Sequence, residues 1–225
     1  PTRRSSDLQT GGGCRASNYI HLLRKALINS GYGHIPVISL NAGGMEKNSG
    51  FKMSIAMLRQ AIAILVYGDI LMLLKNQVKP YEINEGEADA LVDNWVSNLA
   101  EMMDKKRGLC LQEIRNNLKE IVESFSQVPK TDKEKVKVGI VGEIYIKYSS
   151  LGNNNLEELL ISEGCEVMVP GLLGFIMYCM ENGVIDYQLY GGSYFKSISS
   201  KKVNEYLGKM EGLMIDAVSS FSNFA

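Results

Sequence analysis

Two strand-like runs separated by one capped helix constrain the fold of this 225-residue chain more than any other feature. Residues 136–142 and 165–169 read as strands. Between them, Asn155 with Glu158 three residues later predicts a helix start, and Gly164 predicts the end of that helix. This order implies two parallel strands joined by a right-handed crossover.

A second unit of similar type is predicted near the N-terminus. Residues 15–31 place apolar side chains at the helical period, and residues 35–40 have the continuous apolar character of a buried parallel strand. The loop that follows begins with Asn41 and lies where open α/β sheets collect ligands, so one interpretation places it at the same crevice as Cys14. An ordinary turn is the alternative.

Helical patterns occupy the middle of the chain. A helix is predicted over 52–77, a second from an Asn84 cap with Glu87 at its third position, and a third with an apolar stripe ending near Phe125. We therefore expect an α/β protein with flavodoxin- or Rossmann-like parallel-sheet lobes and an inserted helical region. The expected parts are a first lobe (9–50), the helical region (51–127), a linker (128–135) and the truncated start of a second lobe (136–225).

Three glycines bring Cys14 to the start of the first predicted helix. Free N–H groups and the positive end of the helix dipole would then face the thiol and lower its pKa. A thiolate formed in this way is a nucleophile or a metal ligand. The alternative is a glycine-rich turn with a small buried cysteine.

Composition excludes several function classes. Lysine and arginine number 24 against 25 aspartate and glutamate, so neither a nucleic-acid role nor a membrane-surface role has electrostatic support. The four cysteines, at positions 14, 110, 165 and 179, form no Cys-x-x-Cys pair, and without a signal peptide we expect a reducing cytoplasm. The longest apolar stretch, 61–74, is interrupted by Asp69, which favours a core helix over a membrane span.

Residues 1–8, Pro-Thr-Arg-Arg-Ser-Ser-Asp-Leu, resemble a translated sequencing adapter. We therefore expect them to be foreign to the natural protein and the chain to be a fragment of a longer one.

Three segments carry a family resemblance. They are Gln-Thr-Gly-Gly-Gly-Cys-Arg-Ala-Ser-Asn-Tyr (9–19), Val-Gly-Ile-Val-Gly-Glu-Ile-Tyr-Ile-Lys-Tyr (138–148) and Glu-Gly-Cys-Glu-Val-Met-Val-Pro (163–170). In this order they resemble the 2-hydroxyacyl-CoA dehydratase family. The resemblance is closest to the dehydratase-like half of large proteins called CoA-substrate-specific enzyme activase-related.

The resemblance implies a [4Fe-4S] cluster with Cys14 as an iron ligand and Cys179 as a possible second one. It also implies that Gly12, Gly13, Arg15 and Asn18 surround the cluster or an anionic ligand. Gly142 and Glu143 belong to the cofactor site in this interpretation, and no catalytic residue is assigned. Without the resemblance, Glu143 and Lys147 read as a solvated salt bridge.

The function implied by the resemblance is one-electron, ketyl-radical chemistry on an acyl-CoA thioester. The implied partners are an ATP-dependent activase and reduced ferredoxin or flavodoxin. ATP is implied as a cofactor only through the activase. No membrane or nucleic-acid partner is implied. Two alternatives stay open: an iron–sulfur electron-transfer or reductase module without dehydratase activity, and a non-catalytic lobe that docks an activase.

Overall fold

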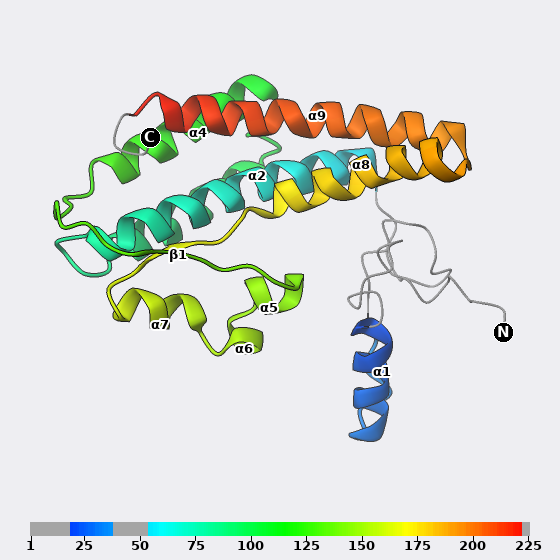
Figure 1. Ribbon diagram of the computed structural model, residues 1–225, viewed down its shortest axis with the longest axis horizontal. Helices are drawn as coiled ribbons and strands as arrows, with labels where there is room; N and C mark the ends of the chain where they lie inside the picture. The colour runs from blue at the N-terminus through cyan, green and yellow to red at the C-terminus, as the bar shows by residue number, and fades with distance from the viewer. Residues whose placement is uncertain (1–18, 38–53, 222–225) are drawn as a thin grey trace. The chain divides into compact units, whose positions relative to one another are not determined.

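The computed structural model describes residues 19–37 and 54–221 (Figure 1). The chain divides into two compact units, 1–58 and 59–225, and each is described by itself. Within the described residues, helices account for 71% and strands for 4%. The expected flavodoxin- or Rossmann-like α/β fold is therefore wrong: this part of the chain is mainly helical, with one two-stranded parallel sheet.

The described part of the first unit is built on α1 (Tyr19–Asn29). The helix ends because Gly31 adopts a φ of +81° and the Tyr32 N–H donates to the Leu27 carbonyl at 2.8 Å. Residues 35–37, the beginning of the expected strand, are not in a strand. The rest of that strand and the Asn41 loop lie outside the described residues.

Long helices dominate the second unit, which begins within α2. Figure 1 shows α8 and α9 as a hairpin lying beside α2 and α4. The helices of this bundle are α2 (Ile55–Val78), η3 (Lys79–Tyr81), α3 (Glu87–Asp104), α4 (Leu111–Ser126), α8 (Leu172–Tyr190) and α9 (Tyr194–Ser219).

One large hydrophobic core joins the α-helices of this bundle, because each of them contributes buried apolar side chains. The stripe predicted on the third helix is confirmed in α4, where Ile114, Leu118 and Phe125 are fully buried. The core also takes Ile70 and Leu74 from α2 and, from α9, Leu207, Met210, Leu213, Met214 and Ala217.

By length and composition alone, the helix over Ile55–Tyr81 could cross a membrane. A core helix of a soluble protein passes the same test. The contacts of α2 with the bundle agree with the core-helix interpretation.

The start of α3 differs from the prediction. Asn84 is not its cap: the helix begins at Glu87, after Gly86 with a φ of +89°. The carboxylate that satisfies the free N–H groups belongs to Glu82, which accepts from Gly86 N–H and Ala88 N–H at 2.8 Å each.

The predicted strand–helix–strand unit is present as a small local motif. Strands β1 (Lys137–Gly139) and β2 (Glu166–Met168) pair in parallel, as expected. The elements between them are α5 (Ile144–Tyr148), α6 (Ser150–Asn153) and α7 (Leu156–Ser162). By sequence, residues 184–190 fit either a strand or a helix, and in the structure they belong to α8. The chain after β2 therefore returns to the helical bundle, and the described sheet ends at two strands.

Candidate functional site

The carboxyl ends of β1 and β2 form the edge where an α/β unit places ligands. Their register pairs Val138 with Val167 and Gly139 with Met168, and the Ile140 N–H donates to the Met168 carbonyl at 2.9 Å. The turns after both strands therefore begin side by side. Gly142 and Glu143 follow β1, and the loop to α8 follows β2.

Glu143 lies at this edge as predicted, and its side chain caps a helix. One carboxylate oxygen accepts from the Tyr145 N–H at 2.9 Å and the Ile146 N–H at 3.2 Å, at the start of α5. The other oxygen is buried and has no hydrogen-bond partner among the described residues. Gly142 has a φ of +143°, a conformation that L side chains rarely adopt, so this turn requires glycine.

The end of α5 is tied to the loop after β2. The Tyr148 hydroxyl donates to the Pro170 carbonyl, and the Lys147 ammonium lies 4.6 Å from the centre of the Tyr148 ring. The salt bridge considered for Glu143 and Lys147 is not among the ion pairs of the described residues; Lys147 makes a cation–π contact instead.

Asp69 supplies a buried carboxylate at the same edge. It comes from α2 and is 6% exposed, and its two oxygens accept from the Leu172 N–H at 2.9 Å and the Leu173 N–H at 2.7 Å. Burial raises the pKa of this carboxyl, although the two backbone hydrogen bonds oppose that shift. A side chain at Gly171 would lie 2.7 Å from the Asp69 carboxylate, so the loop can approach α2 this closely only with glycine there.

A cavity of about 440 Å³ opens beside Asp69. This volume falls in the range of small-molecule sites. Its walls are mostly apolar and come from α2, the end of β2 and the loop after it, α8 and α9; they include Leu73, Met168, Pro170, Leu173, Met214 and Ile215. The acidic groups at its walls are Asp69 and Glu211.

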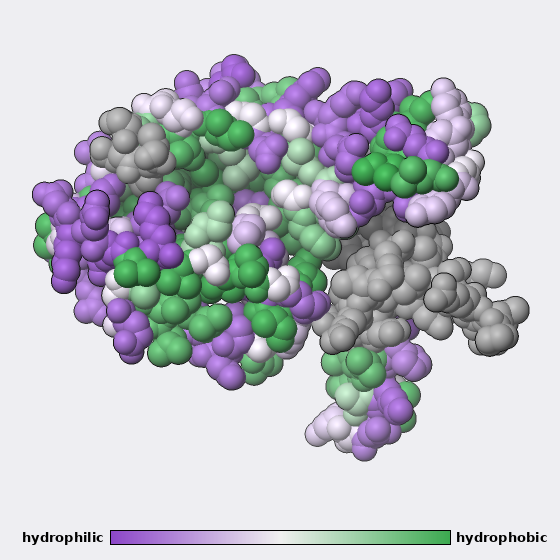
Figure 2. Space-filling model, viewed as in Figure 1, coloured by the Kyte–Doolittle hydropathy of each residue, from purple (hydrophilic) through white to green (hydrophobic). Residues whose placement is uncertain are grey.

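Apolar side chains are also exposed over α5, α6 and α7. Green surface is visible in this region of Figure 2, and the exposed fraction reaches 84% for Leu151 and 55% for Leu159.

The first motif cannot be placed. Gly12, Gly13, Cys14, Arg15 and Asn18 lie outside the described residues.

The three described cysteines lie on separate elements. Cys110 precedes α4 and its backbone N–H donates to Glu113 at 3.2 Å, Cys165 precedes β2 and is half-buried, and Cys179 is exposed in the middle of α8. Among residues 19–37 and 54–221, no group of three or more histidine, cysteine, aspartate or glutamate side chains is arranged to hold a metal. These residues alone do not fit an iron–sulfur cluster, which needs about four ligands.

Sequence reasoning missed Asp69 and Gly171 as parts of this edge. One signal was present: Asp69 is a lone carboxylate inside an apolar helical run, and such a group is buried only with partners. Its partners are backbone N–H groups more than 100 residues away, which carry no signal in the sequence.

Comparisons with protein-family models, with curated proteins and with solved structures find no match to this chain.

Proposed function

We propose that this chain is the dehydratase-like part of a CoA-substrate-specific enzyme activase-related protein, acting in one-electron chemistry on acyl-CoA thioesters. One observation supports the proposal beyond the resemblance itself. The second and third family-like segments, 138–148 and 163–170, are separated by 14 residues, and their strands pair so that the turns that follow them share one edge. A common site for both segments is therefore geometrically reasonable.

The cluster proposal rests on Cys14. The described cysteines do not assemble a ligand set, so we assign none of Cys110, Cys165 or Cys179 to iron and derive no reaction step through a cluster. A bound [4Fe-4S] cluster would supply the one-electron reductant that the proposed chemistry needs.

The described residues have a supporting role in this proposal. Glu143 and Asp69 each satisfy backbone N–H groups at a helix start, and Tyr148 holds the loop after β2. Hydrogen-bonded carboxylates of this kind fix the turns beside which a substrate would bind. The apolar cavity next to Asp69 has the size and lining for a small apolar group.

The test is anaerobic expression of the gene's full reading frame, followed by iron and sulfide analysis and electron paramagnetic resonance. We expect a cluster that the Cys14→Ser variant loses and that the Cys110→Ser variant keeps. Unchanged iron in Cys14→Ser contradicts the ligand assignment. Absence of iron from the unmutated protein contradicts the cluster and favours the activase-docking alternative.

A panel of 2-hydroxyacyl-CoA thioesters, supplied with the activase and a low-potential reductant, then separates the remaining possibilities. Dehydration of any member supports the dehydratase proposal. Reduction of the cluster without any dehydration supports the electron-transfer alternative and overturns the proposal.

A further inference from the structure

The strand–helix–strand segment, residues 137–168, contacts the bundle mainly through polar groups. Its own hydrophobic core is small: the buried residues are Ile140 and Val167, together with Val169 just after β2. From α2, Met72 packs against this cluster. The much larger core of the bundle is a separate cluster, so little apolar area holds the segment in place.

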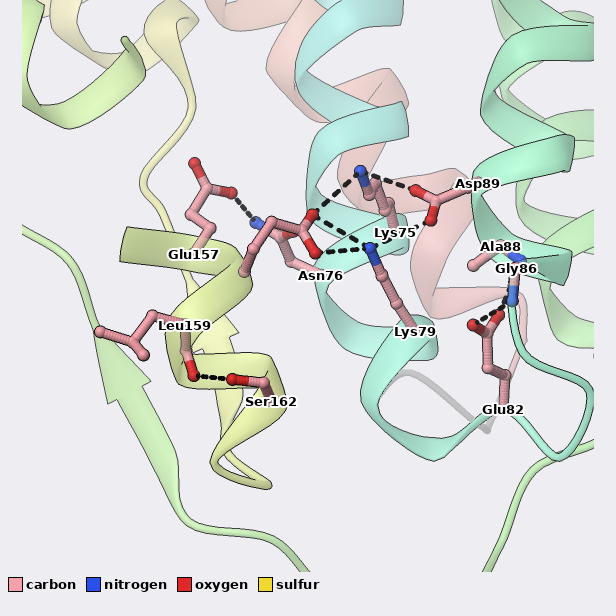
Figure 3. Close-up of polar contacts among 11 residues, drawn as sticks. Lys75, Asn76, Lys79, Glu82, Gly86, Ala88, Asp89, Glu157, Leu159 and Ser162 are labelled. Carbon is pink, nitrogen blue, oxygen red and sulfur yellow. Dashed lines mark hydrogen bonds and ion pairs between the residues drawn. The ribbon is translucent and has the colours of Figure 1, made fainter. Parts of the chain in front are cut away.

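An ion-pair network joins α7 of this segment to α2, η3 and α3 (Figure 3). Lys79 contacts Glu158 at 2.8 Å and Asp89 at 3.0 Å. Lys75 contacts Asp89 at 2.8 Å and lies 3.9 Å from Glu158. The two lysines therefore bridge two carboxylates that come from distant parts of the chain.

Two further hydrogen bonds cross the same interface. The Asn76 amide donates to Glu157 at 3.0 Å, and the Tyr81 hydroxyl donates to Glu166 at 2.7 Å. Figure 3 shows the bond between Asn76 of α2 and Glu157 of α7 next to the lysine network.

The network is exposed enough for salt to weaken it. The Glu158 side chain is 54% exposed and the Asp89 side chain 40%, and ion pairs of this kind are screened by salt. Burial opposes the charge on Lys79, but hydrogen bonds to Glu158 and Asp89 outweigh it and raise the lysine pKa. The bonds from both lysines likewise outweigh burial and lower the pKa of Asp89. Because these groups stay charged around neutral pH, salt is the condition that loosens the network.

The segment is flanked by two short connections without regular structure, residues 132–136 and 169–171. Beyond each connection the chain is anchored. The Thr131 N–H donates to the Tyr81 carbonyl at 2.8 Å, and Asp69 accepts from the first two N–H groups of α8. A motion of the segment can therefore be absorbed at its two ends without disturbing the bundle.

We propose that residues 137–168 form a latch that detaches from α2 and opens as one cooperative unit, with its strand pair separating, and that the ion pairs of Lys75 and Lys79 with Glu158 hold it closed. Met168, the last residue of the latch, lines the cavity beside Asp69, so opening the latch widens the mouth of that cavity. The proposal goes beyond the proposed function and does not rest on it, because every contact that carries it lies among the described residues.

The test is amide hydrogen exchange of the full chain, followed by mass spectrometry, at 0.05 M and at 1 M salt. The Debye length is about 14 Å at the lower concentration and about 3 Å at the higher one. The reporters are two backbone N–H groups of the strand pair. The Ile140 N–H donates to the Met168 carbonyl, and the Glu166 N–H donates to the carbonyl of Val136, the residue just before β1. We expect Glu158→Gln to speed exchange over 137–168 by about 2- to 20-fold at low salt and to leave α4 and α9 unchanged. High salt should speed exchange in the same region of the unmutated chain and have less effect on the variant.

Glu163→Gln is the matched control, because Glu163 is exposed at the end of the same helix and forms no ion pair among those of the described residues. Lys79→Gln breaks the network from its other side and should reproduce the effect of Glu158→Gln. Equal exchange over 137–168 and α4 in all conditions overturns the latch. An equal effect of Glu163→Gln also overturns it, because the network would then not be the restraint.

Discussion

Replacing Tyr67 with phenylalanine removes one buried hydroxyl that joins three parts of the bundle. Tyr67 lies in α2 and is 2% exposed. Its hydroxyl donates to the Gly108 carbonyl at 3.1 Å and accepts from the Asn117 amide of α4 at 2.8 Å. Phenylalanine fills nearly the same volume, so the change tests the polar contacts rather than the packing.

The expected destabilisation follows from the two lost partners. Each hydrogen bond contributes about 1 kcal/mol net, and a buried polar group left without a partner costs about 1–3 kcal/mol. With the Asn117 amide and the Gly108 carbonyl both deprived, we expect Tyr67→Phe to lower the free energy of unfolding by about 2–4 kcal/mol. For a chain of this size that corresponds to a fall in Tm of about 4–16 °C.

Urea unfolding followed by circular dichroism measures the effect. A double-mutant cycle with Asn117→Leu isolates the contact, because removing both polar partners should cost less than the sum of the single changes, by about 1–2 kcal/mol. Tyr178→Phe, at a 63% exposed position of α8, is the control and should change stability by less than about 0.5 kcal/mol. A Tyr67→Phe effect as small as that of the control, or strict additivity with Asn117→Leu, would refute the argument.

The same hydroxyl predicts an alkaline loss of stability. Burial chiefly raises the pKa of Tyr67 to about 12 from 10.0, while the Asn117 hydrogen bond opposes the shift. Because the native state then binds this proton more tightly than the unfolded state, stability falls as pH rises from about 10 to about 12. Tyr67→Phe should show a shallower fall over that window when unfolding is measured at successive pH values. An identical slope in both proteins would contradict the assignment.

Two further changes probe the edge beside the cavity. Asp69→Asn offers one oxygen to two N–H groups, so we expect a loss of about 1.5–3 kcal/mol in urea unfolding, against little effect of Asp186→Asn on exposed α8 surface. Gly171→Ala places a methyl 2.7 Å from the Asp69 carboxylate and should lower the free energy of unfolding by about 1–3 kcal/mol. Gly174→Ala is the control: it has open space around it in α8, so it should leave that free energy unchanged or raise it by up to about 1 kcal/mol. A destabilisation by Gly174→Ala as large as that by Gly171→Ala would refute the close-approach argument.

The period of apolar residues predicted α4, which has one buried face, and did not resolve α8 as one helix. The stripe of α4 is visible in the sequence because polar residues separate its apolar positions. Residues 172–190 are mostly apolar and have no strong helical period, so the sequence predicts a short helix over 172–180 and leaves 184–190 open between strand and helix. Residues 184–190, which could have supplied a further strand, are therefore part of α8, and α8 packs with α9, whose residues from 203 onward read as a helix by sequence.

The parallel pairing of 137–139 with 166–168 was predictable, and the size of the sheet was not. A strand–helix–strand order fixes the relation between its own two strands. Whether other strands join depends on what the rest of the chain buries, which is a tertiary property. Here the chain beyond both strands is committed to the helical core.

The candidate site was predictable in position and not in detail. Gly142 and Glu143 were expected at a strand end and lie there. The cap of α8 could not be foreseen, because Asp69 binds backbone N–H groups, which every residue type except proline provides. The same holds for Tyr67, whose acceptor is the Gly108 carbonyl.

The two kinds of contact on α2 have different consequences for motion. The face with Ile70 and Leu74 is buried in a large apolar core, so separating it from the bundle requires global unfolding. The positions that meet the strand–helix–strand segment include Met72, Lys75, Asn76 and, just past the helix end, Lys79, which offer one apolar side chain and several polar groups. A surface held by polar contacts opens at lower free energy than one held by buried area, so the same helix can be the rigid wall of the bundle and the release point of the segment. Asp69 fixes the start of α8 beside the cavity. This anchor keeps the α8 wall of the cavity in place while the wall at Met168 moves with the segment.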